Sequence, residues 1–162
     1  MSGIGEELDQ AIEAAKRRAS ERQEEDRREQ DEEERSRQEA TKIAQSTVLP
    51  ALKDVVQVAR DREHSAYVVL DDPSAPGSQA ALVRFQYWPG KSTLQDGDYR
   101  YEAKFLVRAD AKLSARVETH TPSAYTSGFG MLADGQDLPA TAQEVRRLAL
   151  EMMKKAIEEQ IV

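Results

Sequence analysis

The chain has 162 residues, a formal net charge of −7 and a pI near 5.0, with 33% charged and 39% hydrophobic residues. This length suits one domain with an extension. The acidic balance argues against general affinity for nucleic acid or anionic membranes, which attract basic surfaces. There is no cysteine, which excludes disulfides and thiolate metal sites.

The N-terminal residues do not resemble a targeting segment. They include Glu6, Glu7, Asp9 and Glu13 and lack a continuous apolar core, so they do not form a signal peptide. No apolar run approaches the roughly 20 residues that a membrane-spanning helix requires. We therefore expect a soluble, cytoplasmic protein.

The first third of the chain has the pattern of a long helix. Its apolar residues fall at helical spacing at Ile4, Leu8, Ala11, Ile12 and Ala15. Residues 16–39 then contain no Val, Ile, Leu, Met or aromatic residue, but eight basic and ten acidic ones. Acid-first pairs such as Glu24 with Arg28 each add roughly 0.2 to 0.5 kcal/mol to a helix. We predict that residues 1–45 form an extended charged helix, as a coiled coil or a single-helix arm.

The charged run at residues 16–39 favours a single helix over a coiled coil. A coiled-coil seam through it would bury Arg22, Asp26, Glu29 and Glu33, which a stable dimer core does not tolerate. Disorder is the alternative, because low hydrophobicity is its signature. Balanced charge at helical spacing favours a self-supporting helix that separates the apolar stripe from the rest of the chain.

Residues 46–162 have the pattern of one globular domain that begins with a helix at about 47–62. Pro50 would kink an uninterrupted helix. We therefore expect a break, with Ser46 or Thr47 as the N-cap of a new helix and Pro50 in its first turn. The apolar face of this helix consists of Leu49, Leu52, Val55, Val56 and Ala59.

Four strands are predicted next, at residues 65–71, 80–88, 99–108 and 113–120. Alternation places Phe85 and Phe105 on an apolar face and Glu102 and Lys104 on a polar one. One wet face is typical of an antiparallel meander that is covered on a single side.

The short link between the last two predicted strands indicates their register. A three-residue loop at 110–112 pairs Ala109 with Leu113 and sets Lys104 opposite Glu118, and Glu102 opposite His120. A shift by two residues would oppose like charges, Lys104 to Arg116 and Glu102 to Glu118, so the first register is preferred.

The last predicted element is a helix at about 142–160, which begins with Thr141 and Glu144 as a capping box. Its apolar residues exceed the single stripe that a helix needs to cover a sheet. The surplus indicates a second contact, either with the helix at 47–62 or with another copy of the chain. The fold class is therefore α+β: a long charged N-terminal helix, then a helix, a four-stranded antiparallel meander and a C-terminal helix packed on one face.

No catalytic or cofactor motif accompanies this fold. His64 and His120 are expected at strand ends in solvent, about 14 Å apart on opposite edges of the sheet, too far to share a metal. Glu102 and Glu118 on the polar face have His120 and Lys104 as expected partners, which disfavours acid–base catalysis. We expect no enzyme activity, no cofactor and no metal.

The candidate partner-binding residues are apolar and lie outside the expected core. Those at the start of the chain form the stripe on the long helix, and the others lie at a strand end or in the connection before the last helix. Folding back of that connection to close the core is the alternative for its members. The candidates are Ile4, Leu8, Ile12, Trp88, Tyr125, Phe129 and Met131.

These features favour a non-enzymatic, oligomerising interaction or adaptor protein, a homodimer with a protein partner and with neither nucleic acid nor membrane as a target. One alternative is an acidic small chaperone or escort that holds a client peptide on the sheet edge or on residues 125–131. Another is a dimeric nucleic-acid-associated protein, which rests on topology-level analogy alone.

Overall fold

The computed structural model describes residues 3–71, 80–89, 100–120, 126–131 and 138–161. Contacts divide the chain into two compact units, Met1–Arg35 and Ser36–Val162. The second unit begins before the boundary at residue 45 that the sequence pattern indicated. Ala40 and Ala44 are fully buried in the core of the second unit, which explains why this part of the helix belongs to it.

The long charged helix is confirmed: α1 is one α-helix, Gly3–Ile43. No described residue of the first unit is buried, so burial of side chains within that unit does not hold the helix together. Its support is local. Glu24 lies 3.9 Å from Arg27 and 3.9 Å from Arg28, and such exposed pairs contribute a few tenths of a kcal/mol each.

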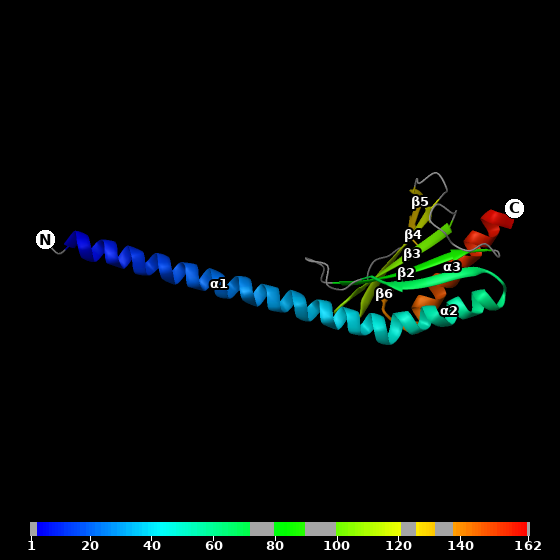
Figure 1. Cartoon of the computed structure of the whole chain (residues 1–162), viewed down its shortest axis with the longest axis horizontal. Coiled ribbons are helices and arrows are strands. Elements are labelled where there is room, and N and C mark those ends of the chain that lie inside the picture. Colours follow the sequence, from blue (N-terminus) through cyan, green and yellow to red (C-terminus); the bar gives the residue numbers. More distant parts are fainter. Residues whose placement is uncertain (1–2, 72–79, 90–99, 121–125, 132–137, 162) are drawn as a thin grey trace. The chain divides into compact units, whose positions relative to one another are not determined.

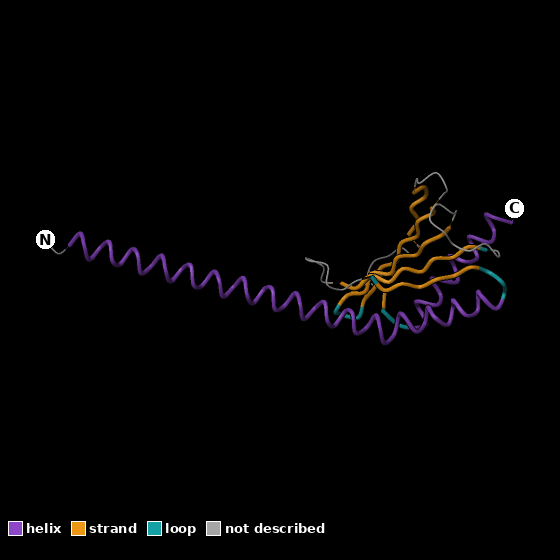
Figure 2. The backbone as a smooth tube through the Cα atoms, viewed as in Figure 1, coloured by secondary structure: helices purple, strands orange, loops and turns teal. Residues whose placement is uncertain are grey.

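Pro50 lies in the first turn of a second helix as predicted, but the expected break with Ser46 or Thr47 as its N-cap is wrong. A π-helical turn, Ala44–Val48, joins α1 to α2 (Leu49–Asp61), and the helical tube in Figure 2 is uninterrupted there. Ser46 and Thr47 lie inside this turn, and Val48 has helical backbone angles and makes no side-chain capping bond. The Leu49 N–H donates to the Ala44 carbonyl five residues back. This wider turn accommodates the Pro50 ring, which in a regular helix would clash with a carbonyl of the preceding turn.

The sheet is antiparallel and contains the four predicted strands in the order β1-β2-β3-β4, followed by a fifth, β5. The bounds are β1 Ser65–Leu70, β2 Ala80–Trp88, β3 Arg100–Arg108, β4 Lys112–His120 and β5 Thr126–Met131. A two-residue strand, β6 (Leu138–Pro139), also pairs with β4. The four-stranded prediction missed β5 because its two glycines weaken the strand pattern, and pairing with the outer edge of β4 decides its conformation.

The predicted register of β3 and β4 is also wrong. The strands pair Val107 with Leu113, so Lys104 lies opposite Arg116 and Glu102 opposite Glu118. Turn geometry decides the register, because the loop is formed by residues 109–111. Ala111 adopts a left-handed φ of 61°, and its N–H donates to the Arg108 carbonyl at 3.1 Å.

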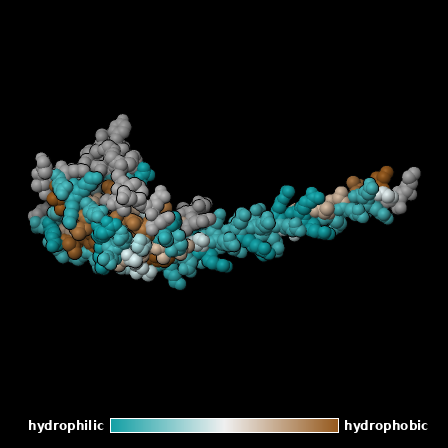
Figure 3. Space-filling view, turned by 180° about the vertical axis from the view of Figure 1, so that it is seen from behind, coloured by the Kyte–Doolittle hydropathy of each residue, from teal (hydrophilic) through white to brown (hydrophobic). Residues whose placement is uncertain are grey.

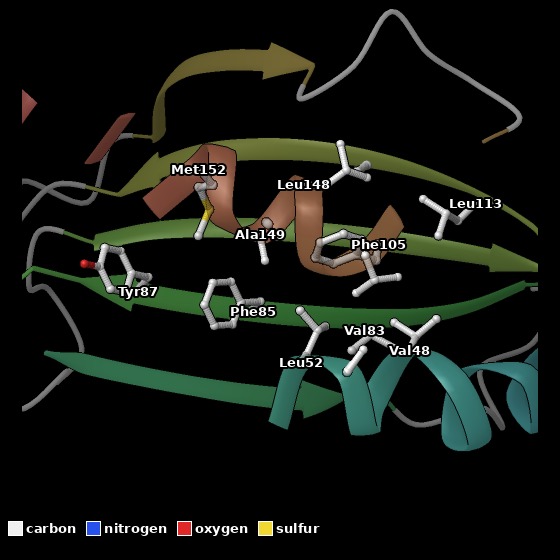
Figure 4. Packing of buried hydrophobic residues seen from close by; sticks show 14 of the residues in the cluster. Val48, Leu52, Val83, Phe85, Tyr87, Phe105, Leu113, Leu148, Ala149 and Met152 are labelled. Atoms are coloured by element: carbon white, nitrogen blue, oxygen red, sulfur yellow. The ribbon is translucent and has the colours of Figure 1, made fainter. Parts of the chain in front are cut away.

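The core lies between the sheet and two helices, α2 and α3 (Ala142–Ile161), which cover the same face (Figure 1). Phe85 and Phe105 point from the sheet toward Leu52 on α2 and Leu148 on α3, and all four are fully buried (Figure 4). The inward-facing side of the predicted strands is therefore confirmed.

α3 begins as predicted but uses only half of the capping box. The Glu144 N–H donates to Thr141 Oγ1 at 3.3 Å, whereas the Thr141 N–H donates to the Pro139 carbonyl. The Glu144 side chain instead binds Arg147, and this bond lowers the pKa of the Glu144 carboxyl. The surplus apolar surface of α3 is largely covered within the unit, since α3 packs on α2 as well as on the sheet.

Candidate interaction surfaces

The predicted stripe on α1 is exposed. Ile4, Leu8 and Ile12 are 77%, 61% and 45% exposed, and their four-residue spacing places them along one side of the helix. Figure 3 shows hydrophobic residues near the N-terminal end of the first unit, Met1–Arg35, and hydrophilic residues along the rest of that unit. Residues 1–15 contain four acidic residues and no basic one, so this apolar stripe lies in a strongly negative segment.

The other predicted binding residues belong to the second unit. Trp88 ends β2, is partly buried and packs against the core cluster, so it does not form an open platform. Tyr125 lies outside the described residues. Phe129 and Met131 lie on β5, where their backbones pair with Glu118 and Arg116. They therefore belong to a strand of the sheet and not to a long irregular connection.

Two buried carboxylates lie on the face of the sheet that α2 and α3 leave uncovered. Glu102 is only 3% exposed and Glu118 only 8%, which corrects the expectation that Glu102 faces solvent. Lys104 lies between them: its Nζ is 3.0 Å from Glu118 Oε2 and 3.9 Å from Glu102 Oε1. The expected Lys104–Glu118 contact therefore forms, although diagonally across the two strands instead of directly.

The neighbouring strands extend this polar cluster. Gln86 Nε2 donates to Glu102 Oε2 at 2.6 Å, and Arg84 lies 3.7 Å from the same oxygen. Arg84 Nε also donates to Asp71 at 2.8 Å. Glu102 is thus held by Gln86, Arg84 and Lys104. Both carboxylates are thus engaged by donors from the sheet itself.

His64 is held within the fold, contrary to the expectation of a solvent-exposed imidazole. It follows Glu63, which adopts a left-handed φ of 62° just after the end of α2. The His64 N–H donates to the Ala59 carbonyl. Its Nδ1 lies 2.5 Å from the hydroxyl of Tyr87. Burial raises the pKa of Tyr87 to about 12, so this hydroxyl keeps its proton at neutral pH. The pair attaches the end of α2 to the end of β2.

The outer edge of β1 is a sheet edge of the kind that the client-peptide alternative requires, although the sequence did not indicate which strand supplies it. The Asp71 N–H donates to the Leu82 carbonyl, which extends the β1–β2 ladder by one residue. In an antiparallel ladder, alternate residues bond to the neighbouring strand, so Tyr67 and Val69 bond inward to β2. The backbone groups of the even-numbered residues, Ala66, Val68 and Leu70, consequently face the outer edge.

Exposed side chains accompany this edge. Tyr67 and Val69 are 41% and 43% exposed on the open face of the sheet. Arg60, from α2, donates to the Ala66 carbonyl at 3.1 Å and lies 5.4 Å from the centre of the Tyr67 ring. The run from Ser65 to Leu70 has no charged residue, and this was the signal available in the sequence.

Comparison of the chain with protein-family models, with curated proteins and with solved structures gives no match. Among the described residues, no group of three or more His, Asp or Glu side chains is placed to hold a metal ion. In the same part of the chain, no helix has the length and apolar character needed to cross a membrane. The fold is of the α+β class, built on an antiparallel sheet.

Proposed function

We propose that this chain is a non-enzymatic, oligomerising adaptor, a homodimer that binds a protein partner through the stripe on α1. The observation that carries the proposal is the exposure of Ile4, Leu8 and Ile12 along one side of a helix. Single exposed hydrophobic residues are common, but aligned ones on an otherwise charged helix mark a contact surface.

The size of the stripe supports an oligomer. Complete burial of these three partly exposed side chains would contribute about 3 to 5 kcal/mol. Association costs at least about 4 kcal/mol in lost translational and rotational freedom. One stripe therefore binds weakly, whereas two stripes carried by a dimer gain affinity through effective concentration.

The charge around the stripe supports a partner other than a second stripe. Four acidic residues and no basic one surround it, so two stripes placed side by side would repel each other. The apolar pattern also covers only about two heptads, whereas coiled coils need roughly three or four. The complementary surface is an apolar groove with a basic rim, which receives the helix through Ile4, Leu8 and Ile12 as anchors.

The test uses tagged full-length protein and compares Leu8→Glu with Gln10→Glu. Gln10 is exposed on the side of the helix away from the stripe, so the control adds the same charge without changing the apolar anchors. We expect a specific partner, quantified by mass spectrometry, to be retained by wild type and Gln10→Glu and reduced at least about tenfold by Leu8→Glu. Circular dichroism checks that both variants keep the helix.

The oligomeric state is measured by light scattering at tens of micromolar. A monomeric wild-type protein would contradict the homodimer. A set of bound proteins that Leu8→Glu leaves unchanged would contradict the role of the stripe.

A further inference from the structure

We propose that two copies of the chain pair through the outer edges of their β1 strands, antiparallel and about a two-fold axis at Val68. The inference rests on the proposed homodimer and names the surface that forms it. Pairing of this kind is isologous, since the same strand contributes to both sides. It joins the two sheets into one.

The backbone supplies the first argument. Ala66, Val68 and Leu70 direct their N–H and carbonyl groups away from β2. For Val68 and Leu70, no hydrogen bond from these outward groups occurs within the described residues. With the axis at Val68, the two Val68 residues face each other, and Ala66 faces Leu70 of the partner copy. Each of these pairs is of the type that exchanges both N–H···O bonds.

The side chains fit the same register. It sets Tyr67 opposite Val69 of the partner copy on the open face, an aromatic side chain against a β-branched one, which is a favourable cross-strand pair. Both residues are more than 40% exposed in the single chain, so pairing covers apolar surface that the fold leaves open.

The distribution of charge along β1 favours a second copy of the chain as the partner of this edge. Each chain carries a net charge of −7, so copies repel each other in general, but the Ser65–Leu70 run is neutral. Two-fold pairing places Asp71 of the partner copy opposite Ser65, close to the position of Arg60. Arg60 caps the Ala66 carbonyl in the single chain and protects the edge. When the partner strand takes over that carbonyl, Arg60 gains a carboxylate beside it.

The test of the register uses the absence of cysteine from the chain. Full-length Tyr67→Cys and Val69→Cys proteins, with different tags, are mixed and mildly oxidised. Directly opposed residues of this non-hydrogen-bonded type lie about 4.5 Å apart between Cα atoms, within disulfide range. Identical positions on the two copies are diagonal neighbours, about 7 to 8 Å apart and beyond that range.

We expect the mixed disulfide to exceed either homodisulfide at least about tenfold, as the difference in geometry requires. Val58→Cys, at an exposed position on α2, mixed with Tyr67→Cys is the control and is expected to give no such excess. Absence of a preferred mixed disulfide overturns the inference.

A second test needs no covalent bond and separates this inference from the proposed function. Tyr67→Lys/Val69→Lys and Tyr67→Glu/Val69→Glu proteins should each be monomeric by light scattering, and mixing them should restore the dimer. A wild-type dimer that both double variants leave intact overturns the β1 interface while the homodimer stands. Monomeric variants that mixing does not restore also overturn it, and would favour a client peptide on this edge. A monomeric wild type overturns both proposals.

Discussion

Replacing Ala111 by glycine is expected to stabilise the second unit, although glycine weakens most positions in a folded chain. Ala111 has a left-handed φ of 61°, a conformation that costs an L-residue with a Cβ about 1 to 2 kcal/mol. Glycine relieves this strain but loses about 0.5 to 1 kcal/mol more in conformational entropy on folding. The net gain therefore lies between about 0 and 1.5 kcal/mol, with a midpoint of roughly 0.75 kcal/mol.

Nothing else at Ala111 offsets that gain. Its side chain is exposed, so no core packing is lost. Its N–H bond to the Arg108 carbonyl, and the bond that its own carbonyl accepts from the Ala140 N–H, both involve backbone atoms that glycine retains.

Urea and thermal unfolding followed by Trp88 fluorescence measure the effect. Trp88 is the only tryptophan and lies on β2, so its emission reports on the second unit, whereas α1 dominates far-ultraviolet circular dichroism. We expect a higher urea midpoint at unchanged slope, and a Tm higher by about 2 to 4 °C for a unit of this size.

Two matched glycine variants identify the register. Ala109→Gly, in the same loop without a positive φ, should lower stability, as should Lys112→Gly in β4. In the alternative register the loop spans residues 110–112, and Lys112 would take the left-handed position. Stabilisation by Lys112→Gly together with destabilisation by Ala111→Gly would refute the Val107–Leu113 pairing.

Two further predictions concern the polar groups of the sheet. Lys104→Met should cost about 2 kcal/mol, between the values for exposed and buried ion pairs, because it removes the Lys104 Nζ contact from the buried carboxylate of Glu118. Glu118→Gln in that background should recover part of the loss in a double-mutant cycle of urea midpoints, and an absence of recovery would contradict the contact. Above pH 10 the wild type should lose stability relative to Tyr87→Phe, progressively as the pH rises toward 12. Burial raises the folded-state pKa of Tyr87 to about 12, so the folded state keeps a proton that the unfolded state releases. Parallel pH profiles of urea midpoints for the two proteins would count against this account.

The two proposed surfaces have complementary roles. The β1 edge is neutral and self-complementary, which suits contact between copies of an acidic chain. The stripe on α1 is apolar and flanked by acidic residues, which suits a groove with basic residues at its rim. A dimer joined at β1 carries two stripes, and this makes a weak individual contact effective.

Local features were predictable because they depend on residues only a few positions apart. Spacing of apolar residues predicted α1 and the inward face of β2 and β3, and Thr141 marked the start of α3. The exposure of Ile4 and Leu8 likewise followed from a stripe that the surrounding charged sequence cannot cover.

The tertiary structure alone decided the features that depend on distant contacts or on backbone geometry. The left-handed Ala111 set the register, and the diagonal reach of Lys104 made opposed like charges tolerable. The outer edge of β4 ordered β5 despite its glycines, and β1 has an open edge because, among the described strands, it pairs with β2 alone. The sequence by itself determined the three helical segments and the first four strands, and which side of β2 and β3 is apolar. The register follows from the backbone geometry of the turn, and the strand number and the open edge follow from pairing between strands; the spacing of apolar residues encodes neither.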